Sequence, residues 1–204
     1  MTDCKAFRIL RGAIILIAVA VIGIFLGKLV SSYELRFMMN REFCGEYRGI
    51  EVYKSGDINK ENCLSFVYTL KAMPEELTEC CEILYFTAED LPLPVYDGVK
   101  NKALGLTQGS TVYISTEDFA EEVIIHEFFH AYDNYHGLLS ESDSFRTAYE
   151  AEKSLFKIDT PVEEAHLSEY FATLGSFYIL SPEEMMTHAP ETYRYFNERF
   201  RYYK

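Results

Sequence analysis

The stretch VIIHEFFHAYDNYHG, residues 123–137, holds three of the five histidines of this 204-residue chain. A helix is expected to begin at Ser115 or Thr116, because the residues that follow are acidic and suit a first helical turn. It is expected to run to about Tyr135, since Gly137 suits the position after a helix C-terminus. This helix decides the interpretation of the fold, because the other expected strands and helices are interpreted relative to it.

Two of those histidines bracket a glutamate, in the order His126, Glu127 and then His130. On a helix, His126 and His130 lie one turn apart on one face, so their imidazoles can converge on one point. Zinc binds imidazole nitrogen, and a catalytic zinc site keeps one position for water. Glu127 is placed to activate that water as the catalytic base, which is the mechanism behind the HExxH pattern. The competing interpretation is an aromatic core helix whose histidines have only packing partners.

Three residues are candidates for the third zinc ligand. His136 lies six residues past His130, which is the metzincin spacing, although Asp133 stands where that motif has glycine. Glu150 lies twenty residues past His130, a spacing typical of thermolysin-like enzymes. Glu169 lies thirty-nine residues past it, inside a further expected helix that would be a rigid platform for a ligand. Spacing alone leaves the three open.

Shorter patterns predict the elements on either side of this helix. The expected strands are 49–54 and 82–87, with a hairpin over 104–116 and an irregular or helical segment over 33–46. The expected helices are 60–72, a short helix after Pro74, and later helices over 160–180, 181–186 and 189–204. Because strands come first and helices follow, the fold class is α+β, with a small antiparallel or mixed sheet packed on the HExxH helix.

The N-terminal part of the chain carries an uncharged run, Gly12–Gly27, between Arg11 and Lys28. Extended to 12–30 it has the length of a membrane span, and a cleaved signal peptide is the alternative. The expected organisation is a basic tail 1–11, a transmembrane anchor 12–30, a connector 31–46 and a metallopeptidase domain 47–204. Basic residues cluster ahead of the span, which favours a single-pass protein with an extracytoplasmic domain, or a secreted one if a signal is cleaved.

Charge and cysteine content limit the partners. The net charge of −13 makes a nucleic-acid partner unfavourable, because phosphate contacts need clustered basic residues. Cys44, Cys63, Cys80 and Cys81 can form disulfides if the domain faces outward, and buried thiols are the equal alternative. The sequence leaves the oligomeric state open.

Three segments, HEFFHAYD (126–133), SEYFA (168–172) and HAPETYRYFNERF (188–200), resemble the catalytic domain of anthrax toxin lethal factor and the related secreted Pro-Pro endopeptidases. The resemblance covers roughly residues 100–204. It implies a zincin-like fold, a Zn²⁺ cofactor, a peptide or protein substrate and Glu127 as base. It also implies that the ligands are His126, His130 and Glu169, and that TVYIS (111–115) is an edge strand to which peptides add.

Three positions depart from the resembled family. Phe129 stands where that family has glycine, Thr173 where it has a glutamate that orients a zinc histidine, and Val162 where it has a transition-state tyrosine. Loss of a donor to the developing oxyanion lowers the rate of peptide hydrolysis. The sequence therefore predicts a membrane-anchored zinc metalloendopeptidase of lethal-factor type, with a catalytically weak or inactive zinc-containing peptide-binding protein as the alternative.

Overall fold

The computed structural model describes residues 41–55, 58–88, 91, 103–115, 121–154 and 167–200, excepting the side chains of 62 and 64–66. The chain divides into two units, Met1–Arg41 and Glu42–Lys204, and the described residues belong, apart from Arg41, to the second. The predicted span 12–30 and Val162 lie outside the described residues. Within the described part of the chain, every helix is too short or too polar to cross a membrane.

The strands form one five-stranded mixed sheet in the order β1-β2-β3-β5-β4. Their bounds are β1 Arg41–Tyr47, β2 Ile50–Ser55, β3 Ile83–Thr87, β4 Gly105–Gln108 and β5 Thr111–Ser115. The strand β3 pairs in parallel with both β2 and β5, whereas β4 pairs antiparallel with β5. The strands expected at 49–54 and 82–87 and the hairpin over 104–116 are confirmed.

One strand lies where the sequence predicts an irregular or helical segment, because β1 occupies residues 41–46 of the expected connector and ends at Tyr47. In this strand only Cys44 is buried, so no alternation of apolar residues marks it. It connects to β2 through a two-residue turn in which Arg48 has φ 52° and Gly49 has φ 80°. Positive φ at both positions is the geometry that matches the twist of paired strands.

The expectation that TVYIS (111–115) is an edge strand is wrong. This segment is β5, which lies between β3 and β4, and its Val112, Tyr113 and Ile114 are buried. A strand covered on both faces and paired on both sides reads as a continuous apolar run. The edge of the described sheet on this side is β4, whose sequence GLTQ is half-buried or exposed.

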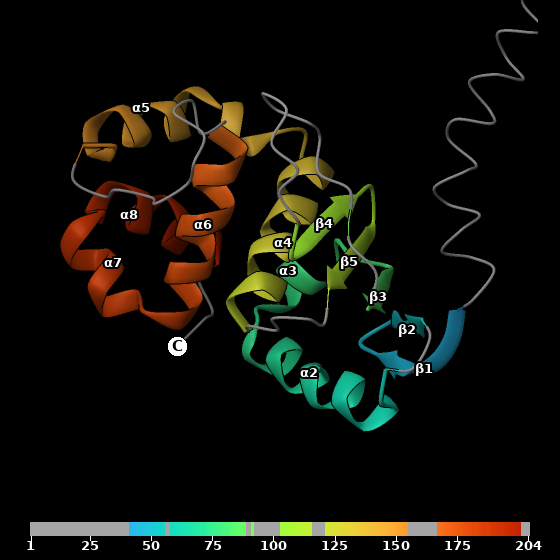
Figure 1. Cartoon of the computed structure of the whole chain (residues 1–204). Helices are drawn as coiled ribbons and strands as arrows, with labels where there is room; N and C mark the ends of the chain where they lie inside the picture. Colours follow the sequence, from blue (N-terminus) through green and yellow to red (C-terminus); the bar gives the residue numbers. More distant parts are fainter. Residues whose placement is uncertain are drawn as a thin grey trace, which may run out of the picture. The chain divides into compact units, whose positions relative to one another are not determined.

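The predicted helices are found wherever the structure describes their residues, but the helix at Asp143–Glu152 and the 3₁₀ turn at Leu139–Glu141 lie where the sequence predicts no element. Their bounds are α2 Lys60–Ala72, α3 Glu75–Thr78, α4 Glu121–Tyr135, α5 Asp143–Glu152, α6 Leu167–Leu180, α7 Pro182–His188 and α8 Pro190–Arg199, with a 3₁₀ turn η1 at Leu139–Glu141. Figure 1 shows α4 between the sheet and α6, and α4 packs against α6, β4, β5, α2 and α3. The α+β class and the sheet packed on the HExxH helix are therefore confirmed.

The central helix α4 is fixed by apolar side chains on both sides. Its Ile124, Ile125, Phe128 and Phe129 are fully buried. On the α6 side, the Phe129 ring makes edge-to-face contacts with aromatic rings of α6, α8 and the residue after α8; these are Phe171, Phe196 and Phe200. Each such pair adds about 0.5–1.5 kcal/mol beyond area burial. The packing therefore holds the side chains that α4 carries in defined positions.

The helix α8 is anchored at its N-terminus by a buried carboxylate. Glu152, at the end of α5, is 2% exposed and accepts hydrogen bonds from the backbone N–H groups of Glu191 and Thr192. It also accepts from the Thr192 hydroxyl at 2.7 Å. An anion is favoured at this position because the first N–H groups of a helix lack partners within the helix.

Candidate metal centre

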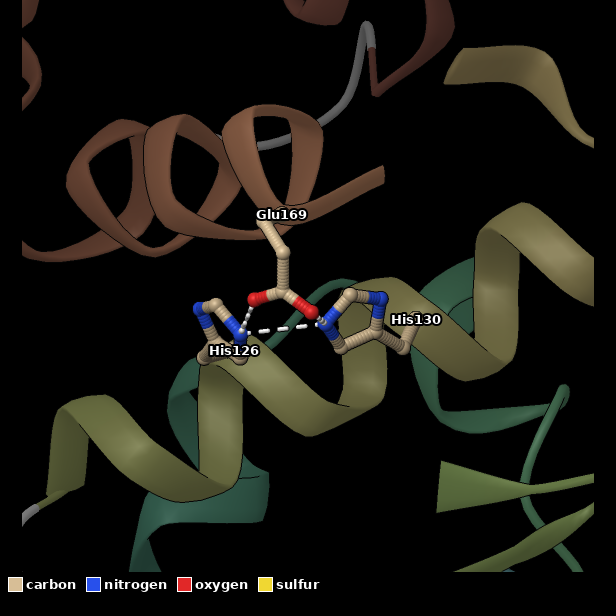
Figure 2. A group of neighbouring side chains, drawn as sticks. All are labelled: His126, His130 and Glu169. Atoms are coloured by element: carbon tan, nitrogen blue, oxygen red, sulfur yellow. Dashed lines mark hydrogen bonds and ion pairs between the residues drawn. The ribbon is translucent and has the colours of Figure 1, made fainter. Parts of the chain in front are cut away.

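Three side chains converge between α4 and α6. His126 and His130 rise from one face of α4, and Glu169 points toward both from the first turn of α6, as Figure 2 shows. The two Nε2 atoms lie 3.0 Å apart. The Glu169 carboxylate lies 3.3 Å from the Nε2 of His126 and 3.4 Å from the Nε2 of His130. These three residues are the group that can hold a metal ion within the described residues.

The separations fit a zinc ion. Ligand atoms bound at roughly 2.0–2.1 Å to a tetrahedral ion lie about 3.3–3.4 Å from one another. The observed distances of 3.0, 3.3 and 3.4 Å are close to the edges of such a tetrahedron. Two imidazole nitrogens and one carboxylate also form a donor set found in catalytic zinc sites. The donor set and its spacing therefore fit the cofactor expected from the sequence.

The group is enclosed on one side and open on the other. The side chains of His126 and His130 are 21% and 16% exposed, whereas that of Glu169 is 47% exposed. Hydrogen bonds with His126 and then His130 hold the pKa of the Glu169 carboxyl well below its usual range. Burial lowers the pKa of His130, but the hydrogen bond with Glu169 and the nearby carboxylates outweigh burial and raise it overall. Glu169 therefore presents an ionised carboxylate that solvent can reach.

The hydroxyl group of Thr173 lies near the second ring nitrogen of His126. The Thr173 Oγ1 lies 3.5 Å from the Nδ1 of His126, one turn along α6 from Glu169. When the Nε2 of a histidine faces a metal, its Nδ1–H donates to an outer acceptor that fixes the orientation of the ring. Thr173 supplies that acceptor at the position where the resembled family has glutamate.

Glu127 lies beside the convergent group but points toward the sheet side of α4. It is 6% exposed, and its Oε2 lies 2.7 Å from the Thr107 hydroxyl of β4. Burial raises the pKa of the Glu127 carboxyl, although the two neighbouring imidazoles and the Thr107 hydroxyl act in the opposite direction. A raised pKa suits a general base, because the best catalytic pKa lies near the working pH.

Two residues at this site escaped the sequence-based prediction. The Thr107 hydroxyl also lies 2.8 Å from the backbone oxygen of Glu127, and Gly105 of the same strand lies against the Glu127 side chain. Gly105 and Thr107 occupy alternate positions of β4, so they share a face. The only signal in the sequence is the small size of both residues on one face of a hairpin strand that precedes the HExxH helix.

The rival ligands lie outside the convergent group. His136 is exposed, and its ring packs on Tyr132 with the ring centroids 4.4 Å apart. Glu150 is exposed and forms an ion pair with Lys153 at 2.6 Å. Neither joins the group of histidines and glutamate described above.

Hydrogen bonds of Asp133 explain why His136 lies away from His126, His130 and Glu169. Its carboxylate is buried and accepts hydrogen bonds from the backbone N–H and the hydroxyl of Ser140, both at 2.7 Å. These bonds tie the C-terminal end of α4 to η1, so the chain turns away after Tyr135. Asp133 is thus a structural residue at the position where a metzincin turn would have glycine.

Comparisons with known proteins give a likeness in fold. No family model matches this chain, and no curated protein matches it. Among solved structures, the PRO-PRO endopeptidase (PPEP-2) from Paenibacillus alvei is similar with a TM-score of 0.58 and 18% sequence identity. The match covers 73% of this chain and 97% of that one. At this identity the likeness establishes the fold, and a fold alone does not fix a function.

Proposed function

We propose that this chain is a zinc-dependent metalloendopeptidase, in which His126, His130 and Glu169 hold the metal and Glu127 is the catalytic base. The observation that carries the proposal is the convergence of two Nε2 atoms and one carboxylate at 3.0–3.4 Å. The fold likeness to an endopeptidase supports the reaction class. The arrangement meets the geometric demands of a catalytic zinc site, which needs three protein ligands and one open position.

The residues of the chain divide the work of hydrolysis. The chemistry supplied by bound zinc is Lewis-acid polarisation of the scissile carbonyl and acidification of a water molecule. Glu127 accepts a proton from the attacking water at a carboxylate oxygen and later delivers it to the leaving amine nitrogen. Burial raises its pKa, and this favours the first of these steps, because a carboxyl group with a raised pKa takes up a proton more readily.

The edge strand β4 is the proposed site for the peptide substrate. Ser115 N–H donates to the Leu104 carbonyl at 2.8 Å, which makes this facing residue pair a hydrogen-bonded one. Such pairs alternate along an antiparallel ladder, so the backbone groups of Gly105 and Thr107 point away from β5. No described strand pairs with Gly105–Gln108 on that side, and Leu91 forms an isolated antiparallel bridge with Ala103 just before β4. An extended peptide can therefore add there by backbone hydrogen bonds.

We also propose that the domain is held at a membrane by the segment 12–30, with the catalytic domain on the extracytoplasmic side. The uncharged run Gly12–Gly27 between basic residues supports this proposal. Protease protection of tagged full-length protein in sealed vesicles distinguishes this orientation from its inverse. A soluble protein that lacks the first thirty or so residues would instead indicate a cleaved signal.

The test of the catalytic proposal uses the purified full-length chain and a peptide library. We expect one equivalent of bound zinc, and we expect Glu127→Gln to keep the zinc while cleavage falls by at least about 100-fold. Glu150→Gln is the matched control and should cleave like the unchanged protein. Zinc bound at one equivalent with no cleavage of any library would favour the zinc-containing peptide-binding protein instead.

A further inference from the structure

We infer that Gly105 and Thr107 of the edge strand β4 are positioning residues that hold the carboxylate of Glu127 in place. The catalytic meaning of this inference rests on the proposed peptidase function. The structural part does not, because it concerns contacts within the chain. Neither residue belongs to the group formed by His126, His130 and Glu169, and neither is part of the HExxH pattern.

Thr107 makes contact with two atoms of Glu127. Its Oγ1 lies 2.7 Å from Oε2 and 2.8 Å from the backbone oxygen of the same residue. A hydroxyl has one hydrogen to donate, so it bridges the carboxylate and the helix backbone as alternative acceptors. This bridge ties the end of the Glu127 side chain to its own main chain and restricts the rotation of that side chain.

Gly105 lies on the opposite side of the carboxyl group, next to Oε1. A β-carbon at this position would lie 2.5 Å from Cγ, 2.6 Å from Oε1 and 2.8 Å from Cδ of Glu127. Those distances are below van der Waals contact, so any other residue at 105 would push the side chain away. Glu127 is 6% exposed and close-packed, so a displaced carboxyl group has little free volume to enter. Thr107 therefore fixes the Oε2 side and Gly105 leaves room on the Oε1 side.

The same two residues face the proposed substrate with their backbones. Their N–H and C=O groups point to the outer edge of β4, while their side-chain positions face Glu127 on α4. Removing the Thr107 hydroxyl leaves those backbone groups unchanged. The change should therefore leave KM for a peptide nearly constant and act on kcat, which depends on where the base stands.

The test compares three substitutions in the full-length protein. Thr107→Val removes the hydroxyl and keeps the shape, Thr107→Ser keeps the hydroxyl, and Thr111→Val makes the same change in the paired strand β5. The Thr111 hydroxyl forms no hydrogen bond within the described residues and serves as the control. We expect Thr107→Val to bind one equivalent of zinc and to lower kcat by about 10-fold or more, with KM within about 2-fold. Thr107→Ser should recover most of the lost kcat, and Thr111→Val should leave it unchanged.

Two results would overturn the inference: an unchanged kcat in Thr107→Val, or a loss of kcat in Thr107→Ser equal to that in Thr107→Val. If the unchanged protein cleaves no peptide, the proposed function fails and crystal structures decide the inference. Zinc-bound Thr107→Val and Gly105→Ala should then show the Glu127 carboxyl group moved from its place beside β4. A carboxyl group that stays in place in both variants would rule the positioning role out, whatever the activity.

Discussion

The ring of Phe129 on α4 occupies the space that a β-carbon on Gly175 of α6 would need. The two helices can approach this closely only because residue 175 has no side chain. The same helices carry the two histidines and Glu169, so their separation also sets the spacing of the metal group. Phe129 stands where the resembled family has glycine, and in this chain the small residue, Gly175, lies on the facing helix.

Gly175→Ala should weaken zinc binding as well as folding. Alanine ordinarily stabilises a helix relative to glycine by about 0.5–1 kcal/mol, but overpacking against a buried ring costs about 1–3 kcal/mol. We expect a net loss in the free energy of unfolding by urea and a zinc Kd raised about 10-fold in a chelator competition. The double variant Gly175→Ala with Phe129→Leu should recover part of both losses. A more stable Gly175→Ala with unchanged zinc affinity would show that α6 moves without consequence for the site.

Substitution of each candidate for the third zinc ligand separates the three residues left open by the sequence. Glu169→Ala should lower zinc affinity by at least about 100-fold, because two imidazoles alone do not complete the site. His136→Ala and Glu150→Ala should retain one equivalent of zinc after dialysis. Loss of zinc in His136→Ala alone would replace this assignment with the metzincin arrangement.

The hydroxyl behind His126 should affect metal binding to a smaller degree. Loss of an outer-shell partner of a zinc histidine typically costs 10–100-fold in affinity, and the 3.5 Å separation places Thr173 at the weak end. We therefore expect Thr173→Val to raise the zinc Kd by about 10-fold, measured by chelator competition. Thr173→Ser should bind like the unchanged protein, and equal affinities in all three would show that the contact contributes nothing.

The carboxylate that caps α8 should matter for stability and little for metal binding. Glu152→Ala removes the acceptor for two backbone N–H groups and the Thr192 hydroxyl, so the free energy of unfolding should fall by about 2 kcal/mol. Glu150→Ala, an exposed change on the same helix, is the control and should change stability little. A loss of stability in Glu150→Ala as large as that in Glu152→Ala would argue against a specific cap.

The sequence predicts the elements whose signal is local. The helix carrying His126 and His130 follows from acidic residues at its expected start, from Gly137 after its end and from the HExxH spacing, and the hairpin over 104–116 is also predicted. The sequence leaves Glu169 open against His136 and Glu150, because a contact between α4 and α6 has no fixed spacing in the chain. The structure brings Glu169 to the histidines through the close approach at Gly175.

The features that the sequence does not predict leave no clear local pattern in it. The sequence TVYIS (111–115) suits an internal strand and an edge strand equally well. It is internal because its hairpin partner β4 takes the edge position in the sheet. Thr107 was missed because a single hydroxyl meeting a glutamate twenty residues away has no pattern of its own. The strand β1 was missed because a single buried residue, Cys44, gives no period of two.

The most direct measurement of the central claim is the zinc dependence of peptide cleavage by the full-length chain. Cleavage of a peptide library is followed before chelation, after removal of the metal, and after zinc is returned. We expect cleavage to disappear with the metal and to return fully at one equivalent of zinc. Cleavage that continues after the metal is removed, or its absence from protein that holds one equivalent of zinc, would contradict the claim.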